Sequence, residues 1–370
     1  MQALILAAGK GERLRPLTET RPKVMLPVAN KPMLQHNLEQ LRGIADSAII
    51  VVGYLGEQIR RHFGDEFAGI RLGYVEQREQ LGTGHALLQA RDRLKGRFIM
   101  LMGDDLYRRE DIKECLKNDL AILTMQGDTR DFGACVAKDG MLADIVEKSP
   151  KPPSDLLNAG LYVLDERIFG HKFRKSSRGE YELTDAVKAL AAKACIRCVQ
   201  SGGWIPIGYP WNMLEATEAI LRETGPQIHP EAVISKKAVI EGPVAIGKGA
   251  QLKNCVIRPY TCIGEGAVIG NFVEIKNSII MGGTKIPHLS YVGDSVIGSG
   301  CNFGAGTKVA NLRFDDRPVR MKVMGRLVDS GRRKLGCVMG DGVKTAINVS
   351  IMPGAVIPPG SSVKTGVVWR

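Results

Sequence analysis

The sequence lacks several features that would assign it to a common class. No apolar run approaches the ~18 residues that a membrane-spanning helix needs. Eight cysteines among 370 residues are too sparse for a disulfide framework, and no basic stretch with a cleavage site opens the chain. These absences predict a soluble protein of the cytoplasm without a membrane partner.

Familiar ligand-binding signatures are also missing. Neither G-x-x-x-x-G-K-[ST] nor G-x-G-x-x-G occurs at the glycine-rich turn near the N-terminus, so neither a P-loop nor a dinucleotide fold is indicated. One C-x-x-C pair, Cys195 and Cys198, has no second pair nearby. Ordinary strand residues are therefore favoured over a zinc site.

Positive charge is concentrated in the C-terminal part. After Gly225 there are 19 basic and 9 acidic residues, against 32 and 30 before it. The segment Asn311–Gly336 alone has 8 basic and 3 acidic residues. A basic loop can bind nucleic acid, but this one has a single aromatic, Phe314, and no nucleic-acid motif. A small polyanionic ligand is the more economical interpretation.

Residues 1–225 alternate short apolar runs with amphipathic stretches. The runs typical of buried parallel strands are Ala3–Ala8, Ala48–Val52, Phe98–Met102 and Leu120–Met125. Helical patterns cover Met33–Leu41 and Ala86–Leu94. The alternation predicts a Rossmann-like, doubly wound α/β domain whose ligands bind at the carboxyl ends of its strands.

Residues 226–370 have a different period. After the breaker pair Gly225-Pro226, aliphatic residues recur every six positions, as in the series from Ile228 to Leu252 and the series from Ile257 to Ile275. A six-residue period is typical of the hexapeptide repeats of a parallel β-helix, with the aliphatic residue pointing inward. The rhythm stops between Asn311 and Gly336, which predicts a loop outside the coils that helps to form a binding face.

The stretch Ala3–Pro27 looks like a phosphate cradle. A predicted strand leads into Gly9-Lys10-Gly11, where glycines let successive N–H groups point at one anion. Arg13 and Lys23 add positive charge. The run L-A-A-G-x-G-x-R-L-x-P-L-T, then P-K and K-P-M-L, resembles the signature of sugar-1-phosphate nucleotidylyltransferases.

That resemblance implies a site and a reaction. A sugar-1-phosphate would attack the α-phosphorus of UTP or dTTP, with Mg²⁺ bound and pyrophosphate released. The implied catalytic residues are Arg13 and Lys23, and the implied metal ligand is Asp104. The implied nucleotide-binding residues are Ala8, Gly9, Gly11, Gln80, Gly82 and Thr83, the last three within the Q-L-G-T-G-x-A match. The implied sugar-phosphate residues are Gly133, Glu147, Lys148 and Asn158.

The C-terminal motifs H-L-S-Y-V-G-D and N-F-G-A-G-T, beginning at His288 and Asn302, resemble the acetyltransferase half of bifunctional bacterial enzymes. Those enzymes acetylate glucosamine-1-phosphate and uridylylate the product. The segment Asn311–Gly336 is most similar to the archaeal version. The resemblance implies a left-handed β-helix, a homotrimer or multiple of trimers, and acetyl-CoA as co-substrate.

Under this resemblance His288 is the general base, because imidazole can accept a proton near neutral pH. Tyr291, Asn302 and Asn311 would bind the acetyl acceptor. The implied acetyl-CoA residues are Ala305, Arg332, Arg333 and Lys334. In relatives, two loop positions tend to be lysine where this chain has Arg317 and Arg320.

One departure concerns the metal site. The family pattern W-x-D places a second carboxylate where this chain has Pro206, in Trp204–Leu214. Three interpretations therefore stay open: a bifunctional enzyme, an acetyltransferase with a weak or inactive first domain, and a non-catalytic nucleotide-sugar-binding subunit. The sequence does not choose between glucosamine- and galactosamine-1-phosphate, or between UTP and dTTP.

Overall fold

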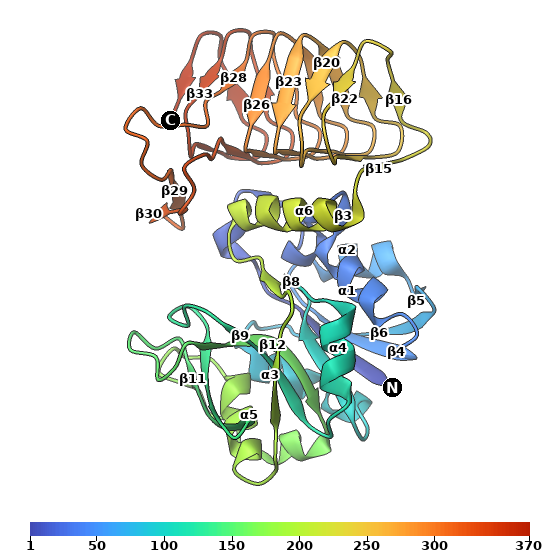
Figure 1. Cartoon of the computed structure of the whole chain (residues 1–370), viewed down its shortest axis with the longest axis vertical. Coiled ribbons are helices and arrows are strands. Elements are labelled where there is room, and N and C mark those ends of the chain that lie inside the picture. The colour runs from blue at the N-terminus through green and yellow to red at the C-terminus, as the bar shows by residue number, and fades with distance from the viewer. The chain divides into compact units, whose positions relative to one another are not determined.

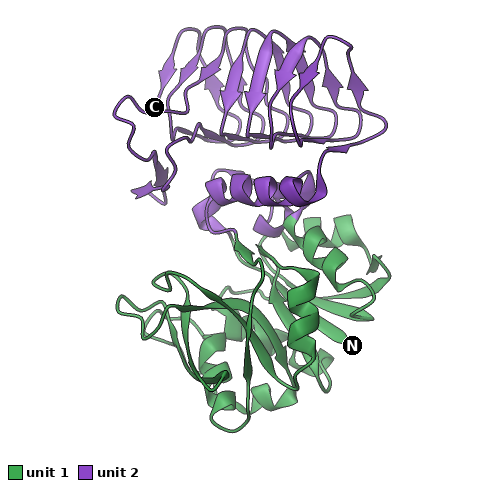
Figure 2. Cartoon of the chain, in the orientation of Figure 1, with its two compact units in different colours: residues 1–10, 33–206 green, residues 11–32, 207–370 purple.

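The computed structural model describes all residues, 1–370, and divides into two compact units (Figure 2). Unit 1 contains residues 1–10 and 33–206, and unit 2 contains residues 11–32 and 207–370. The segment Gly11–Pro32 therefore belongs with the C-terminal residues, although the strand before it belongs to unit 1. Each unit is described separately below.

Unit 1 is built on one ten-stranded sheet (Figure 1). Its order is β10-β11-β13-β9-β12-β7-β1-β4-β6-β5. The strands are β1 (Gln2–Ala7), β4 (Ser47–Val52), β5 (Glu66–Phe67), β6 (Ile70–Glu76), β7 (Phe98–Met102), β9 (Ala121–Gln126), β10 (Gly133–Lys138), β11 (Met141–Glu147), β12 (Leu156–Leu164) and β13 (Arg197–Gln200). The four predicted apolar runs all form strands. They are apolar throughout because helices cover both faces of a doubly wound sheet.

The helices of unit 1 are short. They are α1 (Met33–Leu41), α2 (Gly56–Phe63), α3 (Thr83–Gln89), α4 (Arg109–Leu116) and α5 (Leu183–Ala191), with 3₁₀ turns η4 (Arg91–Arg93) and η5 (Glu166–Gly170). The prediction for Ala86–Leu94 was wrong in its limits. The helix begins three residues earlier, after Gly82, and tightens into η4 beyond Ala90.

The order of the central strands creates a switch point. β1 pairs in parallel with β4 on one side and with β7 on the other, and β6 follows β4. The chain therefore moves outward in one direction from β1 to β6 and returns to the opposite side of β1 for β7. In such sheets the carboxyl ends of the two flanking strands diverge and leave a crevice for ligands.

Unit 2 winds its strands into three stacked parallel sheets (Figure 1). Consecutive strands enter the three sheets in turn, so each coil contributes one strand to each face. The faces are β15-β18-β21-β24-β27-β31-β34, β16-β19-β22-β25, and β17-β20-β23-β26-β28-β33-β36, with β32-β35 as a separate pair. Asn302 bridges Lys285 of β25 and Lys344 of β32, which continues the second face. This arrangement is compatible with a β-helix.

The coil strands are mostly two to four residues long. Their bounds are β15 (Gln227–Ile228), β16 (Val233–Ile234), β17 (Val239–Ile240), β18 (Ala245–Ile246), β19 (Gln251–Leu252), β20 (Cys255–Ile257), β21 (Cys262–Ile263), β22 (Val268–Asn271), β23 (Val273–Lys276), β24 (Ile279–Ile280), β25 (Lys285–His288), β26 (Tyr291–Gly293), β27 (Val296–Ile297), β28 (Lys308–Val309), β31 (Val338–Met339), β32 (Lys344–Thr345), β33 (Ser350–Ile351), β34 (Val356–Ile357), β35 (Ser362–Val363) and β36 (Val368–Trp369). The repeating aliphatic residues end these strands and fill the interior of the coils.

The first coil is an exception to this burial. Ile228 is 45% exposed and Ile234 is 36% exposed, whereas Ile246, one coil further on from Ile228, is only 2% exposed. No earlier coil packs beneath the first one, and an end strand of a solenoid lacks a neighbour on that side. The inward position of these residues is therefore only half filled.

The basic segment Asn311–Gly336 leaves the coils, as expected, but it is not an irregular loop. It contains an antiparallel hairpin of β29 (Arg320–Val323) and β30 (Arg326–Asp329). The turn residues Met324 and Gly325 both have positive φ, 48° and 80°. Two positive φ values are the mark of the tight turn that matches strand twist in a hairpin.

The rest of unit 2 lies before and between these elements. The segment Gly11–Pro32 contains 3₁₀ turns η1 (Glu12–Leu14), η2 (Leu17–Glu19) and η3 (Lys23–Met25) and the pair β2 (Pro27–Val28) and β3 (Lys31–Pro32). Helix α6 (Pro210–Thr224) leads into the coils and ends at Gly225, the predicted breaker.

Two further strands, β8 (Asp105–Leu106) and β14 (Ile205–Pro206), form a small pair in unit 1.

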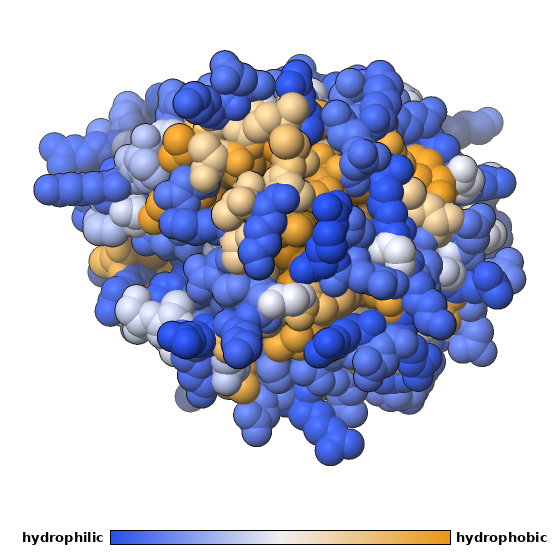
Figure 3. All heavy atoms as spheres, turned by 90° about the horizontal axis from the view of Figure 1, so that it is seen from below, coloured by the Kyte–Doolittle hydropathy of each residue, from blue (hydrophilic) through white to orange (hydrophobic).

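The exposed side chains and the lengths of the helices can be compared with what a membrane-spanning helix needs. The face in Figure 3 is mostly hydrophilic, with apolar side chains gathered in a broken central band. No helix is both long and apolar enough to cross a bilayer. All eight cysteines are free thiols.

Candidate functional site

The loops that leave β1 and β7 meet at the switch point of unit 1. The backbone N–H of Gly103 donates to the carbonyl of Leu6 at 2.8 Å, which keeps the two strand ends in register. Ala8 and Gly9 therefore lie at the same sheet edge as Asp104. Three residues that the sequence selected come together here because β1 and β7 are neighbours.

Gln80 reaches the same edge by way of a glycine that sequence reasoning missed. A Cβ on Gly53 would lie 2.9 Å from the Ala8 carbonyl oxygen and 2.9 Å from Gln80 Nε2. Gly53 follows β4, so any side chain there would separate the turn after β1 from Gln80. A glycine directly after a predicted buried strand is the signal that could have identified it.

Gly82 and Thr83 hold the loop of Gln80 against the segment before α5. Gly82 has φ +101°, and a Cβ there would lie 2.6 Å from the Tyr181 carbonyl oxygen. Leu183 N–H donates to Thr83 Oγ1 at 3.2 Å. The close approach therefore depends on the absence of a side chain at Gly82.

Three predicted sugar-phosphate residues converge at the ends of β10, β11 and β12. Gly133 pairs with Glu147 in register, and a Cβ on Gly133 would lie 3.1 Å from Glu147 Oε2 and 3.2 Å from Asn158 Cβ. Asn158 is oriented by its own contacts, since its Nδ2 donates to Tyr162 Oη at 2.6 Å. Burial raises the pKa of the Glu147 carboxyl, although Lys148 and Arg178 act in the opposite direction.

Arg178 is a charged neighbour of this group that sequence reasoning did not find. Its guanidinium lies 2.7 Å from the buried carboxylate of Glu182 and 3.9 Å from Glu147 Oε1. Lys148, at the end of β11, is exposed and has φ +44°. No spacing rule in the sequence links Arg178 to Glu147, because the two are 31 residues apart.

The turn that carries Asp104 and Asp105 is held by two side chains, Asn37 and Trp204. Buried Asn37 donates from Nδ2 to the carbonyls of Asp105 at 2.8 Å and Met102 at 3.3 Å. Trp204 Nε1–H donates to Asp105 Oδ2 at 3.1 Å. Burial raises the pKa of Tyr107 well above its usual value, and the carboxylates of Asp105 and Asp104 raise it further.

Pro206 lies directly beside this turn. Strand β14 pairs with β8 so that Pro206 is the register partner of Asp105. No group of three or more His, Cys, Asp or Glu side chains is arranged to hold a metal. A hard cation that takes one or two carboxylates and completes its shell with substrate phosphates and water still fits Asp104.

The later part of the predicted phosphate cradle, from Gly11 onward, belongs to unit 2 and carries Arg13 and Lys23. The Arg13 guanidinium lies over the Tyr209 ring, 5.2 Å from its centroid, at the distance of a cation–π contact. Lys23 is only 9% exposed, and its Cβ would lie 2.8 Å from a Cβ on Gly11. The two predicted catalytic cations and Gly11 are therefore parts of one compact segment.

The predicted acetyl-transfer residues occupy successive coils. His288 is exposed at the end of β25, and its carbonyl accepts the N–H of Gly306 at 3.4 Å. Ala305 therefore lies one coil above His288. Asn302 is exposed and bridges Lys285 of β25, so it lies in the same coil as Ala305.

Tyr291 and Asn311 belong to a buried polar network. Asn311 Nδ2 donates to Tyr291 Oη at 3.3 Å and to Asp294 Oδ2 at 2.6 Å. Asn277 Nδ2 donates to the other oxygen of Asp294 at 2.7 Å. Burial raises the pKa of Tyr291, while its bond with Asn311 lowers it. A cavity of about 570 Å³ adjoins Tyr291 and Lys308.

The predicted CoA-binding cations already have partners. Arg332 lies 3.1 Å from Glu215 of α6, and Arg333 lies 2.7 Å from Asp316. The backbone of Lys334 forms an isolated antiparallel β-bridge with the backbone of Leu312, at the base of the hairpin. The charges of Arg332 and Arg333 are thus partly neutralised, and a phosphate group would compete with the carboxylates of Glu215 and Asp316 for them.

The fold and the switch-point loops define a nucleotidyltransferase. The family model described as nucleotidyl transferase matches residues 2–223, and a model described as the GMPPB C-terminal domain matches residues 252–368. A solved UDP-glucose pyrophosphorylase complexed with UDP-glucose aligns with 60% of this chain and 98% of its own at a TM-score of 0.54 and 24% identity. That structure supports the fold of the first part.

Curated relatives cover nearly the whole chain. The bifunctional protein GlmU of Methanocaldococcus jannaschii is 42% identical over 96% of this chain and 92% of its own length. A bifunctional sugar-1-phosphate nucleotidylyltransferase/acetyltransferase of Sulfurisphaera tokodaii is 40% identical over 100% and 97%. The chain belongs to this family of bifunctional transferases, and it is therefore an enzyme of nucleotide-sugar synthesis.

Proposed function

We propose that residues 1–225 transfer a nucleotidyl group from UTP or dTTP to a sugar-1-phosphate. The observation that supports this most is the meeting of Ala8, Gly9, Asp104 and Gln80 at the switch point. A sugar-phosphate oxygen forms a bond to the α-phosphorus, the bond from that phosphorus to the bridging oxygen breaks, and pyrophosphate leaves. Catalysis of this kind consists mainly of positioning and charge neutralisation.

The proposed roles follow the chemistry of each group. Arg13 binds the leaving phosphates, and Lys23 binds the α-phosphate. The backbone of Ala8, Gly9 and Gly11 lets N–H groups approach the triphosphate. Gln80 binds the base edge, assisted by Gly82 and Thr83.

The sugar-1-phosphate would lie against the ends of β10, β11 and β12. Glu147 and Asn158 hydrogen-bond its hydroxyl groups, Lys148 faces its phosphate, and Gly133 leaves them room. Asp104 would hold Mg²⁺, which when bound neutralises phosphate charge.

The coils of unit 2 carry out the second proposed reaction, acetyl transfer from acetyl-CoA to an amino-sugar-1-phosphate. His288 accepts the proton of the attacking amine, the new C–N bond forms at the thioester carbon, and the C–S bond breaks to release CoA thiol. Tyr291, Asn302 and Asn311 bind the acceptor. A backbone N–H near Ala305 stabilises the developing oxyanion, and Arg332, Arg333 and Lys334 bind CoA phosphates.

We further propose that these coils form a left-handed β-helix and that the functional domains are residues 1–225 and 226–370. We also propose that the protein works as a homotrimer or a multiple of trimers. Three exposed apolar side chains support an assembly: Phe272 is 68% exposed, Leu289 56% and Ile347 52%. Leu289 is next to His288, so the apolar edge runs beside the proposed base. Sedimentation of the purified chain tests the assembly directly.

Product assays test both reactions. Purified protein is given acetyl-CoA with glucosamine- or galactosamine-1-phosphate, and separately Mg²⁺, UTP or dTTP and each sugar phosphate. We expect CoA release with one amino sugar and its loss in His288→Ala, with Ser235→Ala, at a turn of the first coil, as control. Absence of CoA release with either amino sugar would refute the acetyltransferase proposal.

A second candidate function follows from Pro206. Because Pro206 pairs with Asp105, a position beside the proposed metal ligand has no carboxylate, and the first reaction could be slow or absent. Pyrophosphate release several orders of magnitude below CoA release would favour an acetyltransferase whose first part only binds nucleotide. Equal rates would exclude that candidate.

A further inference from the structure

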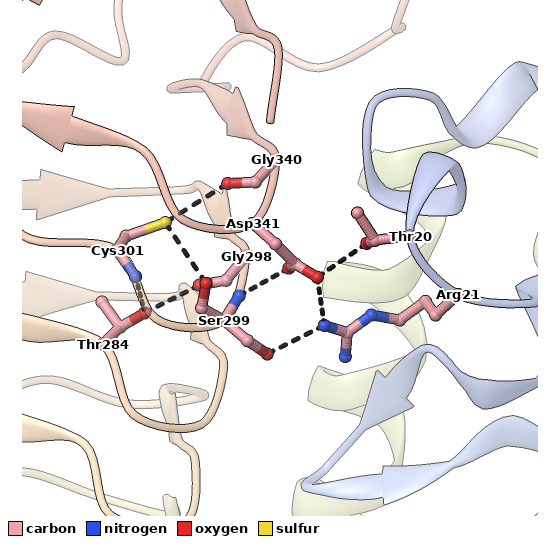
Figure 4. Close-up of polar contacts among 8 residues, drawn as sticks. All are labelled: Thr20, Arg21, Thr284, Gly298, Ser299, Cys301, Gly340 and Asp341. Atoms are coloured by element: carbon pink, nitrogen blue, oxygen red, sulfur yellow. Dashed lines mark hydrogen bonds and ion pairs between the residues drawn. The ribbon is translucent and has the colours of Figure 1, made fainter. Parts of the chain in front are cut away.

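Asp341, at a corner of the coils, contacts two residues of the segment Gly11–Pro32 (Figure 4). Its Oδ2 accepts hydrogen bonds from Thr20 Oγ1 at 2.6 Å and from Arg21 Nη2 at 2.6 Å. Arg21 Nη2 also donates to Ser299 Oγ at 2.9 Å. All four side chains belong to unit 2.

The corner that receives Arg21 is held by a hydrogen bond and by close packing within the coils. The second oxygen of Asp341 accepts the N–H of Ser299 at 2.7 Å, which ties two successive coils together. A Cβ on Gly298 would lie 2.6 Å from Asp341 Oδ1, so the carboxylate occupies space that only a glycine leaves open. Both charged partners are about one-fifth exposed, 21% each. Their geometry is therefore set by the coils rather than by water.

Two more bonds hold the end of the same segment. Ala29 N–H donates to Thr217 Oγ1 of α6 at 3.3 Å, and Asn30 Nδ2 donates to the Ile263 carbonyl at 2.9 Å. The segment is thus fixed to the coils and α6 at Thr20–Arg21 and again at Ala29–Asn30. Lys23 lies between these two anchors.

The proposed phosphate-binding cations are on this anchored segment. Lys23 follows Arg21 after one residue, Pro22, whose ring restricts φ. The orientation of Arg21 is therefore transmitted to Lys23 through a stiff connection. Small displacements of a positioning group lower rates strongly, by up to ~100-fold for 1 Å.

We propose that Asp341 is a positioning residue for nucleotidyl transfer: through Thr20 and Arg21, the acetyltransferase coils hold the segment that carries Arg13 and Lys23. The predicted loss of rate rests on the proposed nucleotidyl transfer, whereas the predicted loosening of Gly11–Pro32 does not. The coils would thus have a role in nucleotidyl transfer that acetyl transfer itself does not require.

Three variants test the pair: Asp341→Asn, Arg21→Gln and the double variant. The asparagine keeps Oδ1 for Ser299 but turns an N–H donor toward Thr20 and Arg21. We expect kcat for pyrophosphate release to fall by about 10- to 100-fold in each single variant. KM for the acetyl acceptor and the rate of CoA release should change less than about 2-fold. The double variant should be no slower than the single variants, because both remove one interaction.

Hydrogen exchange supplies a readout that does not require activity. Backbone amides within Gly11–Pro32 should exchange faster in Asp341→Asn, while those of β7 and β9 keep their wild-type rates. Glu241→Gln, which breaks an exposed ion pair with Arg258 in another coil, is the matched control and should alter neither readout.

Unchanged exchange in Gly11–Pro32 for both single variants would overturn the proposal. A parallel fall of both activities with the melting temperature would overturn it too, since that result indicates general destabilisation. If the wild-type protein releases no pyrophosphate, the proposed first reaction fails. Faster exchange confined to Gly11–Pro32 would still support the anchor.

Discussion

Replacement of Asn37 by alanine should destabilise unit 1 and loosen the turn that carries Asp104. Asn37 is 1% exposed, and its Nδ2 reaches the carbonyls of Asp105 at 2.8 Å, Met102 at 3.3 Å and Gly103 at 3.4 Å. These carbonyls end β7 and begin β8. The alanine variant leaves them without this donor inside the protein.

The expected change in the free energy of unfolding combines the hydrogen bonds that are lost with the removal of an amide oxygen that has no partner. Two N–H donors at about 1 kcal/mol each, and a carbonyl left unpaired at about 1–3 kcal/mol, would destabilise the unit. Asn37 Oδ1 already lacks a partner, so its removal recovers part of that cost. We expect a net loss of about 2–3 kcal/mol, which for a domain of this size lowers Tm by roughly 4–12 °C.

Thermal unfolding followed by circular dichroism measures this loss, with Gln35→Ala as control. Gln35 lies on the same helix and bonds only Glu39 one turn away at 2.9 Å, an interaction of about 0.2–0.5 kcal/mol. Asn37→Asp should be worse at neutral pH, because a carboxylate would face three carbonyl oxygens, and acid should relieve it. An Asn37→Ala variant with the Tm of Gln35→Ala would refute the reasoning.

Three further predictions concern the proposed sites. Gly133→Ala places a Cβ 3.1 Å from Glu147 Oε2, so KM for the sugar phosphate should rise about 10-fold while KM for the nucleotide stays the same; unchanged kinetics would contradict the proposed pocket. Pro206→Asp adds a carboxylate beside Asp105, and titration with Mg²⁺ should show half-maximal pyrophosphate release at a lower concentration than in the wild type; a higher concentration would count against Asp104 as the metal ligand. Burial raises the pKa of Glu147, so its ionisation costs stability as pH rises from its unfolded to its folded pKa. As the pH rises above the ordinary glutamate pKa of about 4.3, the free energy of unfolding should therefore fall less in Glu147→Gln than in the wild type; an equal fall in urea titrations would exclude this cause.

Local pattern was enough to predict most elements. The four apolar runs form strands because each is buried on both faces of one sheet. The six-residue period predicts the three stacked sheets of unit 2, since an inward residue must recur once per face. The limits of the helix at Thr83 were missed because a glycine and a threonine in its first turn weaken the pattern.

The hairpin in Asn311–Gly336 shows where local signals were present but outweighed. Met324-Gly325 lies between alternating apolar and polar residues, yet the loss of the six-residue period across the segment predicted only a loop. Arg178 shows the opposite case. Its contact with Glu147 arises only because two segments distant in sequence return to one sheet edge.

The sequence by itself determined the family, the two kinds of repeat and the residue types that the proposed chemistry needs, because these depend on short motifs and on spacing. Only the tertiary structure decided that Gly133, Glu147 and Asn158 converge, that Pro206 faces Asp105, and that Gly11–Pro32 belongs to the compact unit of the coils. These facts depend on strand order and on contacts such as Arg21 with Asp341, which join residues more than three hundred positions apart. Local preferences carry no information about such pairs, since the free energy that forms them comes from long-range packing.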